Sequence, residues 1–529
     1  MAISSSFALA CRPRLPLRPS LLHSVHRTSF GSLAVIETLD DPENIILSDG
    51  TRDSDAPSKR VGSARRKFEW TKLSSKDVGI TNHMIPRSTR QVLDGLKKKG
   101  FDVYLVGGCV RDLILRRTPK DFDVITSAEL KQVLRIFSRC EIVGKRFPIC
   151  HVHIDGTIIE VSSFSTSARK FGRDLSFDSE RPIEFDDKDF VRWRNCLQRD
   201  FTVNSLMFDP FGKVIYDYIG GLEDIRKAKV RTTIPANRSF IEDCARILRA
   251  IRVAARLGFS FTRDTALNVK SLSTSIQRLD KGRILLEMNY MLAYGSGEAS
   301  MRLLWKYGLL ELILPFQAAY LVRSGFRRKD TTSNMLLSLI SNMDKFLAPD
   351  RPCHTSLWIV ILAFHKALSD QPRYPLAVAA FGLAVHNGGN MSEAINIARS
   401  ITMPHDESFR ELLENQNPDF SELKLEVQNI ASSVKNALTD MTDEYHVSKA
   451  MAKYPRAPYT DLVFVSFGLY LKTCSIFECA RKGRERGFVA KQGSKIDYDA
   501  LTFGSLQELR HVFARIIFDT VYPLSLSNE

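Results

Sequence analysis

Two aspartates, Asp121 and Asp123, are separated by a single residue. On a β-strand, side chains at positions i and i+2 point to the same face, so both carboxylates would aim at one spot. Two adjacent carboxylates repel each other unless a divalent cation lies between them, and Mg²⁺ prefers carboxylate and phosphate oxygens. The spacing therefore predicts a metal site on a strand.

A glycine pair, Gly107-Gly108, stands thirteen residues before this acidic pair, at the end of an apolar stretch that begins at Tyr104. The pattern predicts a strand, a glycine turn and a short helix that carries Arg111. A glycine turn before a helix offers backbone N–H groups and a partial positive charge to a phosphate. A triphosphate cradle beside metal-binding carboxylates indicates nucleotidyl transfer.

A third acid, Glu160, lies in a predicted hairpin. Residues 151–154 and 158–161 have strand character, and Asp155-Gly156 is a typical turn between them. A carboxylate between apolar neighbours has two explanations here. Glu160 is either a third acid that faces the metal or a solvent-facing residue on a half-buried strand.

The next segment, residues 165–194, is polar and without period, and it predicts a long mobile loop over the site. The sequence then continues with Arg199, Asp200 and Asn204. Arg199 could contact phosphate, and the other two could bind a ribose hydroxyl or equally serve as a helix cap and a turn residue. Residues 208–221 predict another hairpin, which closes the sheet.

Residues 241–259 predict a long amphipathic helix with a stop at Gly258. At 100° per residue its charged side chains share one side and its apolar side chains the other. The charged side consists of Glu242, Asp243, Arg246, Arg249, Arg252 and Arg256. Such a stripe offers hydrogen-bonding edges to a base and positive charge to phosphates. A solvated face of salt bridges is the alternative.

Together, these motifs resemble the class II nucleotidyltransferases, which include the bacterial-type poly(A) polymerases and the CCA-adding tRNA enzymes. The resemblance covers about residues 88–315 and rests on three ordered motifs: Gly107-Gly108-x-Val110-Arg111-Asp112 with Asp121-x-Asp123, Arg199-Asp200-Phe201-Thr202-x-Asn204, and Glu242-Asp243-x-x-Arg246. It implies an α/β head with the nucleotidyltransferase fold, in which helices accompany a small mixed sheet. An all-α neck, body and tail would follow the head.

The resemblance also implies roles for the side chains. Asp121 and Asp123 would hold two Mg²⁺ ions, with Mn²⁺ as a substitute, which activate the RNA 3′-hydroxyl and neutralise the leaving pyrophosphate. Glu160 is the candidate for a third catalytic carboxylate. The residues implied to bind the ATP substrate are Gly107, Gly108, Arg111, Arg199, Asp200 and Asn204, with Asp243 and Arg246 reading its base. The residues expected to contact RNA are Lys145, Arg146, Arg249, Arg252 and Arg256.

A later motif of the family matches Arg283 and Glu287, which are four residues apart in a predicted neck helix. The alternative is an ordinary helix ion pair, which contributes only ~0.3–0.5 kcal/mol.

The segment at residues 142–152 resembles one that marks the bacterial poly(A) polymerases and is missing from CCA-adding enzymes. Within it, Lys145 and Arg146 could touch RNA or triphosphate, whereas Phe147 and Ile149 would pack. The segment favours repeated AMP addition. A CCA-adding tRNA nucleotidyltransferase and a catalytically inactive RNA-binding relative stay as alternatives.

Composition agrees with an RNA enzyme. The net charge of the 529-residue chain is +15, and residues 1–60 contain seven basic and seven acidic residues, so the excess belongs to the remainder. A basic body suggests a polyanionic partner, here RNA 3′ ends of mRNA, decay fragments or tRNA, although a passive basic surface is the alternative. The nine cysteines form no CxxC pair, which argues against zinc. The longest apolar runs, 357–364 and 376–385, are too short to span a bilayer, so no membrane partner is expected.

Residues 1–36 contain no acid, seven serines and four arginines, which is typical of an organellar transit peptide. The opening favours the chloroplast, with the mitochondrion as a second address and an untargeted disordered arm as the alternative. The predicted domains are a transit peptide and acidic linker (1–60), a basic linker (61–85), the catalytic head (86–235), a base-selecting and RNA-binding neck (236–315), and an RNA-binding body and tail (316–529). A basic run in the tail is either an RNA contact or a solvated loop, and it consists of Arg481, Lys482, Arg484, Arg486 and Lys491. The sequence does not indicate an oligomeric state.

Overall fold

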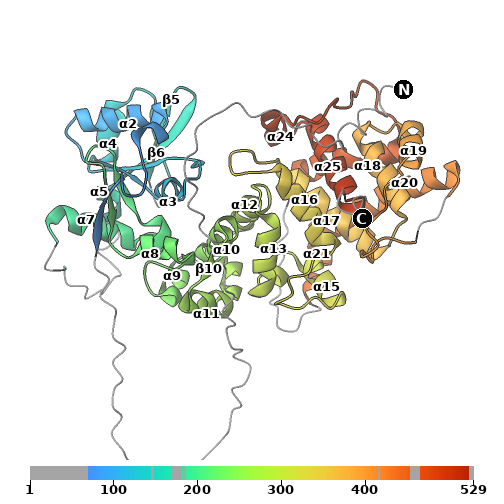
Figure 1. Cartoon of the computed structure of the whole chain (residues 1–529), viewed down its shortest axis with the longest axis horizontal. Helices are drawn as coiled ribbons and strands as arrows, with labels where there is room; N and C mark the ends of the chain where they lie inside the picture. The colour runs from blue at the N-terminus through green and yellow to red at the C-terminus, as the bar shows by residue number, and fades with distance from the viewer. Residues whose placement is uncertain are drawn as a thin grey trace, which may run out of the picture.

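The computed structural model describes residues 70–144, 148–168, 182, 185–414, 418–452 and 465–523. Over these residues an N-terminal part built on a mixed β-sheet is followed by a C-terminal part built of helices (Figure 1). The predicted fold class, an α/β head followed by a helical region, is confirmed. None of the helices in these ranges is both long enough and apolar enough to cross a membrane.

The head is organised by one eight-stranded sheet with the strand order β1-β8-β7-β2-β3-β6-β5-β4. Only β3 and β6 pair in parallel, and the other neighbours are antiparallel. The strands are β1 (Thr71–Ser74), β2 (Val103–Val106), β3 (Asp123–Thr126), β4 (Cys140–Val143), β5 (Ile149–Ile154), β6 (Thr157–Ser163), β7 (Met207–Asp209) and β8 (Val214–Asp217). All four residues of β2 are buried, so this central strand fixes the position of the turn that follows it.

Both predicted hairpins are confirmed. β5 and β6 are joined by Asp155 and Gly156, whose φ angles of 49° and 75° lie in the left-handed region that such a turn needs. β7 pairs with β8 as expected. One correction concerns the segment 61–85, predicted as a basic linker, because its residues Thr71–Ser74 form edge strand β1 and pair with β8.

Helices cover the sheet and connect its strands. They are α2 (Arg87–Lys98), α3 (Gly108–Ile114), α4 (Leu130–Ile136), α5 (Phe164–Ala168), α7 (Asp187–Leu197) and α8 (Gly221–Arg226), with the 3₁₀ turns η1 (Asn82–Met84) and η2 (Thr202–Asn204). The prediction of a long loop over residues 165–194 was wrong at both ends, which are helical. Residues 169–181 and 183–184 lie outside the described ranges.

The loop prediction failed because α7 buries polar side chains instead of an apolar stripe. Arg192 donates to the hydroxyls of Tyr218 (2.9 Å) and Tyr104 (2.8 Å) and to Asp189 (2.7 Å), all in the interior. Asp186 caps the helix by accepting from the backbone N–H of Asp189. A helix held by a buried ion pair has no hydrophobic period to reveal it.

The C-terminal part is almost entirely helical. Its first helices are α9 (Ala236–Glu242), α10 (Ala245–Leu257), α11 (Arg263–Ser271), η3 (Ser273–Arg278), α12 (Lys281–Leu292), α13 (Gly297–Lys306), α14 (Leu310–Ile313) and α15 (Pro315–Arg323). They continue with α16 (Met335–Phe346), α17 (Thr355–Asp370), α18 (Pro375–His386), α19 (Met391–Arg399), α20 (Phe420–Thr442), α21 (Glu444–Met451), α22 (Phe467–Phe477), α23 (Cys479–Lys482), α24 (Tyr498–Phe503) and α25 (Leu506–Val521). Two short strands, β9 (Lys229–Val230) and β10 (Ser260–Phe261), pair in parallel beside α10.

The predicted helix over residues 241–259 is interrupted, which is a second correction. α9 ends at Glu242, Asp243 adopts an extended backbone conformation, and α10 begins only at Ala245. The predicted stop is confirmed, because Gly258 caps α10 with a φ of 72°. Glu242 and Asp243 therefore do not share a helix face with the arginines.

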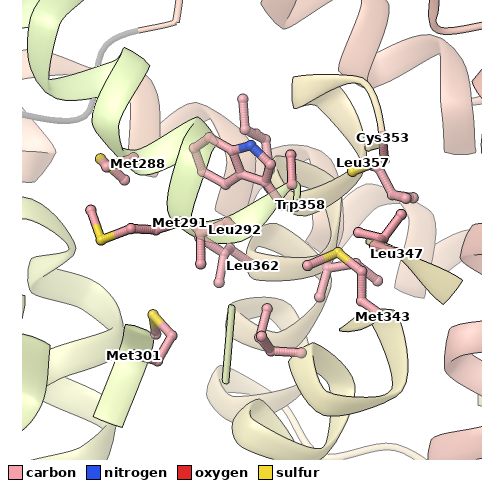
Figure 2. Packing of buried hydrophobic residues seen from close by; sticks show 14 of the residues in the cluster. Met288, Met291, Leu292, Met301, Met343, Leu347, Cys353, Leu357, Trp358 and Leu362 are labelled. Atoms are coloured by element: carbon pink, nitrogen blue, oxygen red, sulfur yellow. The ribbon is translucent and has the colours of Figure 1, made fainter. Parts of the chain in front are cut away.

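Two clusters fix the elements that carry the site. In Figure 2, Met288 and Leu292 of α12 pack with Trp358 and Leu362 of α17 in the buried core. The indole N–H of Trp358 also donates to Asn289 of α12 at 3.1 Å. The neck helix is thereby held against the body.

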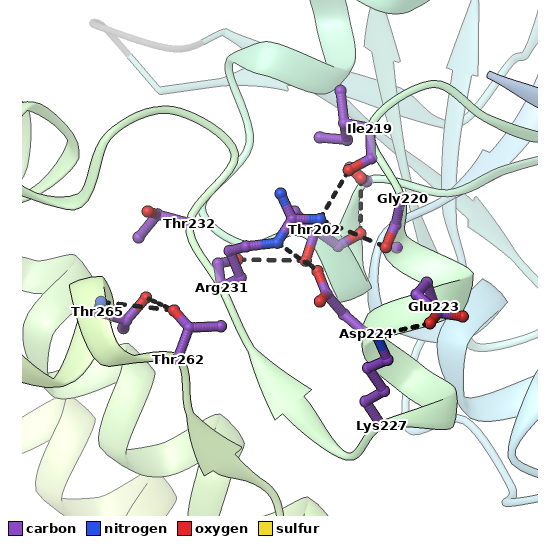
Figure 3. A network of polar contacts seen from close by, with 12 residues as sticks. Thr202, Ile219, Gly220, Glu223, Asp224, Lys227, Arg231, Thr232, Thr262 and Thr265 are labelled. Carbon is purple, nitrogen blue, oxygen red and sulfur yellow. Dashed lines mark hydrogen bonds and ion pairs between the residues drawn. The ribbon is translucent and has the colours of Figure 1, made fainter. Parts of the chain in front are cut away.

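In the head, η2 is fastened by the polar network of Figure 3. The hydroxyl of Thr202 donates to Asp224 at 2.5 Å, and Arg231 donates to Asp224 at 2.8 Å and to the carbonyl of Ile219 at 2.9 Å. Because Thr202 begins η2, the network fixes the turn that ends at Asn204.

Candidate active site

The acidic pair lies where β2 ends and the neighbouring strand β3 begins. Asp123 is the first residue of β3 and pairs with Val106, the last residue of β2. A Cβ atom on Gly107 would lie 3.0 Å from the Asp123 carboxylate and 3.2 Å from the guanidinium of Arg199. With a φ of 83° as well, only glycine fits this position, so the turn packs directly against the acid.

Asp123 lies in an environment short of positive charge. Burial, together with the charges of Asp121 and Glu160, raises its pKa from 3.8 to about 7, against the opposing charge of Arg199. A buried carboxylate beside another acid fits a divalent cation with hard oxygen ligands. Asp121 and Asp123 are therefore the residues that would hold Mg²⁺.

Glu160 lies on the same face of the sheet as Asp123 but does not form a group with Asp121 and Asp123. Val124 pairs with Val161, so Asp123 and Glu160 stand one position earlier on neighbouring parallel strands. The Glu160 side chain is nevertheless 54% exposed, and it lies 3.9 Å from the imidazole of His151. Among the described residues, no three His, Cys, Asp or Glu side chains are grouped to hold one metal ion.

A pocket of about 270 Å³ opens beside the acidic pair, between the head and the first helices of the neck. Its walls come from α3, η2, α10 and α12. Of the predicted site residues, those that line it are Gly108, Arg111, Asp121, Asp200, Asn204, Arg249, Arg252 and Arg256. Residues from the first two motifs and from the arginine stripe of α10 thus meet in one cavity.

A chain of hydrogen bonds crosses the pocket wall. Arg111 donates to Asn204 at 2.5 Å, Asn204 donates to Asp200 at 3.1 Å, and Arg249 donates to Asp200 at 3.1 Å. Burial acts to raise the pKa of Asp200, but Arg249 and these hydrogen bonds outweigh it and hold the pKa below its usual value. Asp200 is therefore an ionised acceptor, and it does not cap η2, whose N-cap residue is Phe201 without a side-chain cap hydrogen bond.

The arginines of α10 face buried acids rather than water. Arg256 lies 3.5 Å from Asp112, and Arg252 lies 3.2 Å from Glu287. Glu287 also accepts from Arg283 at 2.8 Å, so the predicted i,i+4 pair exists, but as part of a three-residue cluster. The explanation of this stripe as a solvated salt-bridge face was wrong for these arginines.

We expect Glu287→Ala to lower the stability of the protein by about 3–5 kcal/mol, because two partly buried guanidinium groups would lose their shared carboxylate. The Glu287 residue is 1% exposed. The matched control is Glu242→Ala, whose i,i+4 pair with Arg246 is 41% exposed on the acid side, where a loss of about 0–1 kcal/mol is typical. Chemical denaturation of both variants measures the difference, and equal losses would contradict the expectation.

Arg199 has a guanidinium available for a ligand. Its Nε atom is buried and forms no hydrogen bond with any described residue. The same side chain lies against Gly107 and lowers the pKa of Asp123. A cation in this position fits an anionic group bound beside the acidic pair.

Asp243 and Arg246, the predicted base readers, do not line the pocket. Asp243 accepts from the backbone N–H of Ala245 at 3.1 Å at the start of α10. Arg246 donates to Ser239 at 2.9 Å and to the carbonyl of Gln198 at 3.1 Å. Arg246 therefore fixes the backbone next to Arg199.

Lys120, Tyr290 and Tyr294 are among the pocket residues that sequence reasoning missed. The Lys120 ammonium lies 4.8 Å and 4.9 Å from the centres of the two tyrosine rings, and burial lowers its pKa. The position of Lys120 beside Asp121 was the only local signal, because the tyrosines come from α12 and the residues just after it. Lys145 and Arg146 lie outside the described residues.

Comparisons with known proteins find similarity over parts of this chain. The family model "Poly A polymerase head domain" matches residues 103–231, and the model "Probable RNA and SrmB- binding site of polymerase A" matches residues 258–321. Poly(A) polymerase I of Haemophilus influenzae is 29% identical over 286 residues, which cover 54% of this chain and 63% of that protein. The chain thus spans less than two thirds of that relative.

Two further proteins are similar. The CCA-adding enzyme of Geobacillus stearothermophilus is 33% identical over 220 residues, which cover 41% of this chain and 52% of that enzyme. The crystal structure of the Bacillus stearothermophilus CCA-adding enzyme in complex with CTP covers 75% of this chain and 92% of that chain, with a TM-score of 0.41 and 21% sequence identity.

Proposed function

This chain belongs to the poly(A) polymerase/CCA-adding family of class II nucleotidyltransferases, and we propose that it is a polynucleotide adenylyltransferase. In this proposal it adds AMP from ATP to RNA 3′ ends without a template and releases pyrophosphate. The observation that carries the proposal is a pocket lined by Asp121 and by arginines from α3 and α10, with Asp123 interacting with Asp121 beside it.

The proposed mechanism follows from the electrostatics of this junction. Asp121 and Asp123 would hold Mg²⁺, which would supply charge neutralisation at the triphosphate and lower the pKa of the RNA 3′-hydroxyl. Arg199, whose buried Nε has no partner among the described residues, contributes positive charge beside the acids. Arg111 and Asn204 orient Asp200, an ionised acceptor suited to a ribose hydroxyl. The protein thus contributes mainly positioning and fixed charge.

Two observations support AMP addition over CCA addition. The segment at residues 142–152 resembles one that marks bacterial poly(A) polymerases. The Haemophilus relative named poly(A) polymerase I aligns over 286 residues, against 220 for the Geobacillus CCA-adding enzyme. The second enzyme is nevertheless the more identical of the two, so CCA addition is the competing function.

The test is nucleotide incorporation by the full chain with labelled ATP or CTP and Mg²⁺. One substrate is a generic RNA and the other is tRNA that lacks its CCA end. Long A tails on both RNAs are the expected result. A single CCA restricted to tRNA would establish the competing function, and retained RNA binding without incorporation would establish an inactive relative.

We expect Arg246→Ala to weaken the preference for ATP over CTP more than it weakens RNA binding. The physical reason is the anchor between Arg246 and the Gln198 carbonyl, which fixes the backbone that leads into Arg199 and Asp200. The control is Arg263→Ala, an exposed arginine at the start of α11. Relative kcat/KM values for the two nucleotides measure the effect, and an unchanged preference would exclude the role.

We also propose that the enzyme works in an organelle, in the chloroplast first and the mitochondrion second. The support is the composition of residues 1–36, which are rich in serine and arginine and free of acids. Residues 1–60 fused to a fluorescent protein should direct it into plastids. Diffuse fluorescence outside both organelles would contradict this proposal.

A further inference from the structure

A second pocket, of about 290 Å³, lies in the C-terminal helices. It is formed between α18, α19, α25 and the irregular segment at residues 484–494, which we call the tail loop. Figure 1 shows these helices at the end of the molecule opposite the sheet. The pocket lies outside both segments that match family models, which end at residue 321.

The tail loop is held in place along its length. The backbone N–H of Glu485 donates to the carbonyl of Gly388 at 2.9 Å, and Gln507 donates to the carbonyl of Val489 at 3.0 Å. Arg515 of α25 donates to the carbonyl of Ser494 at 3.0 Å. A loop fastened at its start, middle and end gives the pocket a preformed wall.

One part of the pocket wall is apolar. Leu383 and Ile397 contribute from α18 and α19, and Phe488 and Ala490 contribute from the tail loop. A Cβ atom on Gly388 would lie 2.3 Å from the Phe488 ring, so the ring packs directly on this glycine. The fixed ring and the aliphatic side chains form a surface that suits a flat, partly apolar group.

A buried histidine at the edge of this pocket has a ring nitrogen without a hydrogen-bond partner among the described residues. His511 lines the pocket, is 5% exposed and lies 3.3 Å from the ring nitrogen of His386 through its Nδ1 atom. Its Nε2 atom forms no hydrogen bond with any described residue. Burial lowers the pKa of His511 to about 3 and that of His386 to about 4, so both rings are neutral at neutral pH. A neutral imidazole suits a hydrogen bond to a neutral polar edge.

The pocket carries a surplus of positive charge. Arg484, Lys491 and Arg515 line it, and Lys491 is neutralised by Glu508. The one acid in the lining, Glu393, accepts from the side chain of Asn390 at 2.9 Å. With Lys491 paired to Glu508 and the charge of Glu393 counted, the lining keeps an excess of one positive charge, and Arg484 and Arg515 can attract an anionic group.

We propose that this pocket binds a nucleotide, with its base between the apolar walls and against His511 and its phosphate at Arg484 and Arg515. The nucleotide is either one residue of a bound RNA or a free nucleoside phosphate, since both present the same base and phosphate. The RNA source rests on the proposed function. An RNA bound in this pocket would be held at a position far from its 3′ end.

The first test is photo-crosslinking of the full chain, with two probes in parallel. One probe is a 20-nucleotide RNA that contains 4-thiouridine, and the other is 8-azido-AMP. Digestion and mass spectrometry should find crosslinks in residues 484–494. Crosslinks from the RNA alone identify RNA as the source, and crosslinks from the azido nucleotide identify the free nucleotide. The absence of both crosslinks would overturn the proposal.

The second test measures the affinity of three variants for the probe that crosslinks, either the RNA or the nucleotide, at two salt concentrations. Arg484→Ala and the pocket-filling Ala490→Phe should each weaken binding five- to tenfold. The control Arg486→Ala changes an exposed arginine of the same loop that does not line the pocket, and it should stay within twofold. With RNA, Arg484→Ala should also reduce the salt slope by about 0.7, whereas Ala490→Phe should leave the slope unchanged.

Arg484→Ala and Arg486→Ala could weaken binding equally while Ala490→Phe keeps wild-type affinity. That result would show that the probe binds only to a charged surface, and it would overturn the proposal of a nucleotide pocket. Incorporation of AMP into a saturating five-nucleotide primer separates the two proposals. If the pocket proposal fails, the protein still extends this primer. If the catalytic proposal fails, the primer stays unextended while crosslinking at the tail loop persists.

Discussion

Asp123→Asn should reduce AMP incorporation at least about a thousandfold, because metal-assisted charge stabilisation contributes several kcal/mol and each 1.4 kcal/mol is a factor of about ten. Asp121→Asn should have a comparable effect. The affinity for RNA should stay within several-fold in both variants, since neither carboxylate attracts a polyanion. Single-turnover incorporation and filter binding measure the two quantities.

The matched control for this pair is Asp155→Asn, which changes an aspartate in the β5–β6 turn. Asparagine tolerates the left-handed conformation of that residue, with its φ of 49°. The control should keep wild-type incorporation. Near-normal turnover by either active-site variant would refute the metal role of the pair.

The same substitution has a signature in stability that does not depend on turnover. The pKa of Asp123 is raised from 3.8 to about 7 in the folded protein, so the folded state binds the proton more tightly than the unfolded state. The ionised Asp123 carboxylate therefore destabilises the folded protein. This effect grows as pH rises from about 4 to about 7 and is complete above that range. Without metal, Asp123→Asn should raise the Tm at pH 8, with a smaller gain at pH 5. Mg²⁺ should stabilise the wild type more than the variant.

Gly107→Ala should lower incorporation about a hundredfold, because a displacement of about 1 Å at a catalytic group costs a factor of that size. The added methyl group would lie 3.0 Å from the Asp123 carboxylate and 3.2 Å from Arg199, and one of them must move. The φ of 83° adds backbone strain of about 1–2 kcal/mol.

Gly100→Ala is a close control, because Gly100 has a φ of 84° and no atom within 4 Å of the added Cβ. Both variants should lose stability through the backbone strain, as measured by denaturation, and Gly107→Ala should lose more because of its close contacts, but only Gly107→Ala should lose activity. Equal activities would show that the close contact with Asp123 is not needed for catalysis.

Local sequence patterns predicted the parts of the site that depend on neighbouring residues. The strand, glycine turn and helix around Gly107 follow from glycine conformation and an apolar run, and the hairpin before Glu160 follows from its Asp-Gly turn. The arginine face of α10 follows from helical periodicity. The break at Asp243 did not, because charged residues before an amphipathic helix carry no stop signal.

What the sequence could not predict depends on contacts between distant residues. Glu287 has its partners on both α10 and α12, so an i,i+4 spacing revealed only half of its environment. Lys120 meets Tyr290 and Tyr294 only because α12 is packed beside the acidic pair. The helix α7 was not predicted because its interior face is held by Asp189 and Arg192 instead of apolar side chains.

The position of β1 has a practical consequence for shortened versions of the protein. A version that starts at residue 86 keeps every motif of the site but removes the partner of β8. It would also remove Trp70, whose ring stacks on Tyr218 at 5.8 Å. The exposed edge of β8 would then offer unpaired N–H and C=O groups to other chains and promote aggregation. Soluble truncations of this enzyme should therefore begin before Trp70.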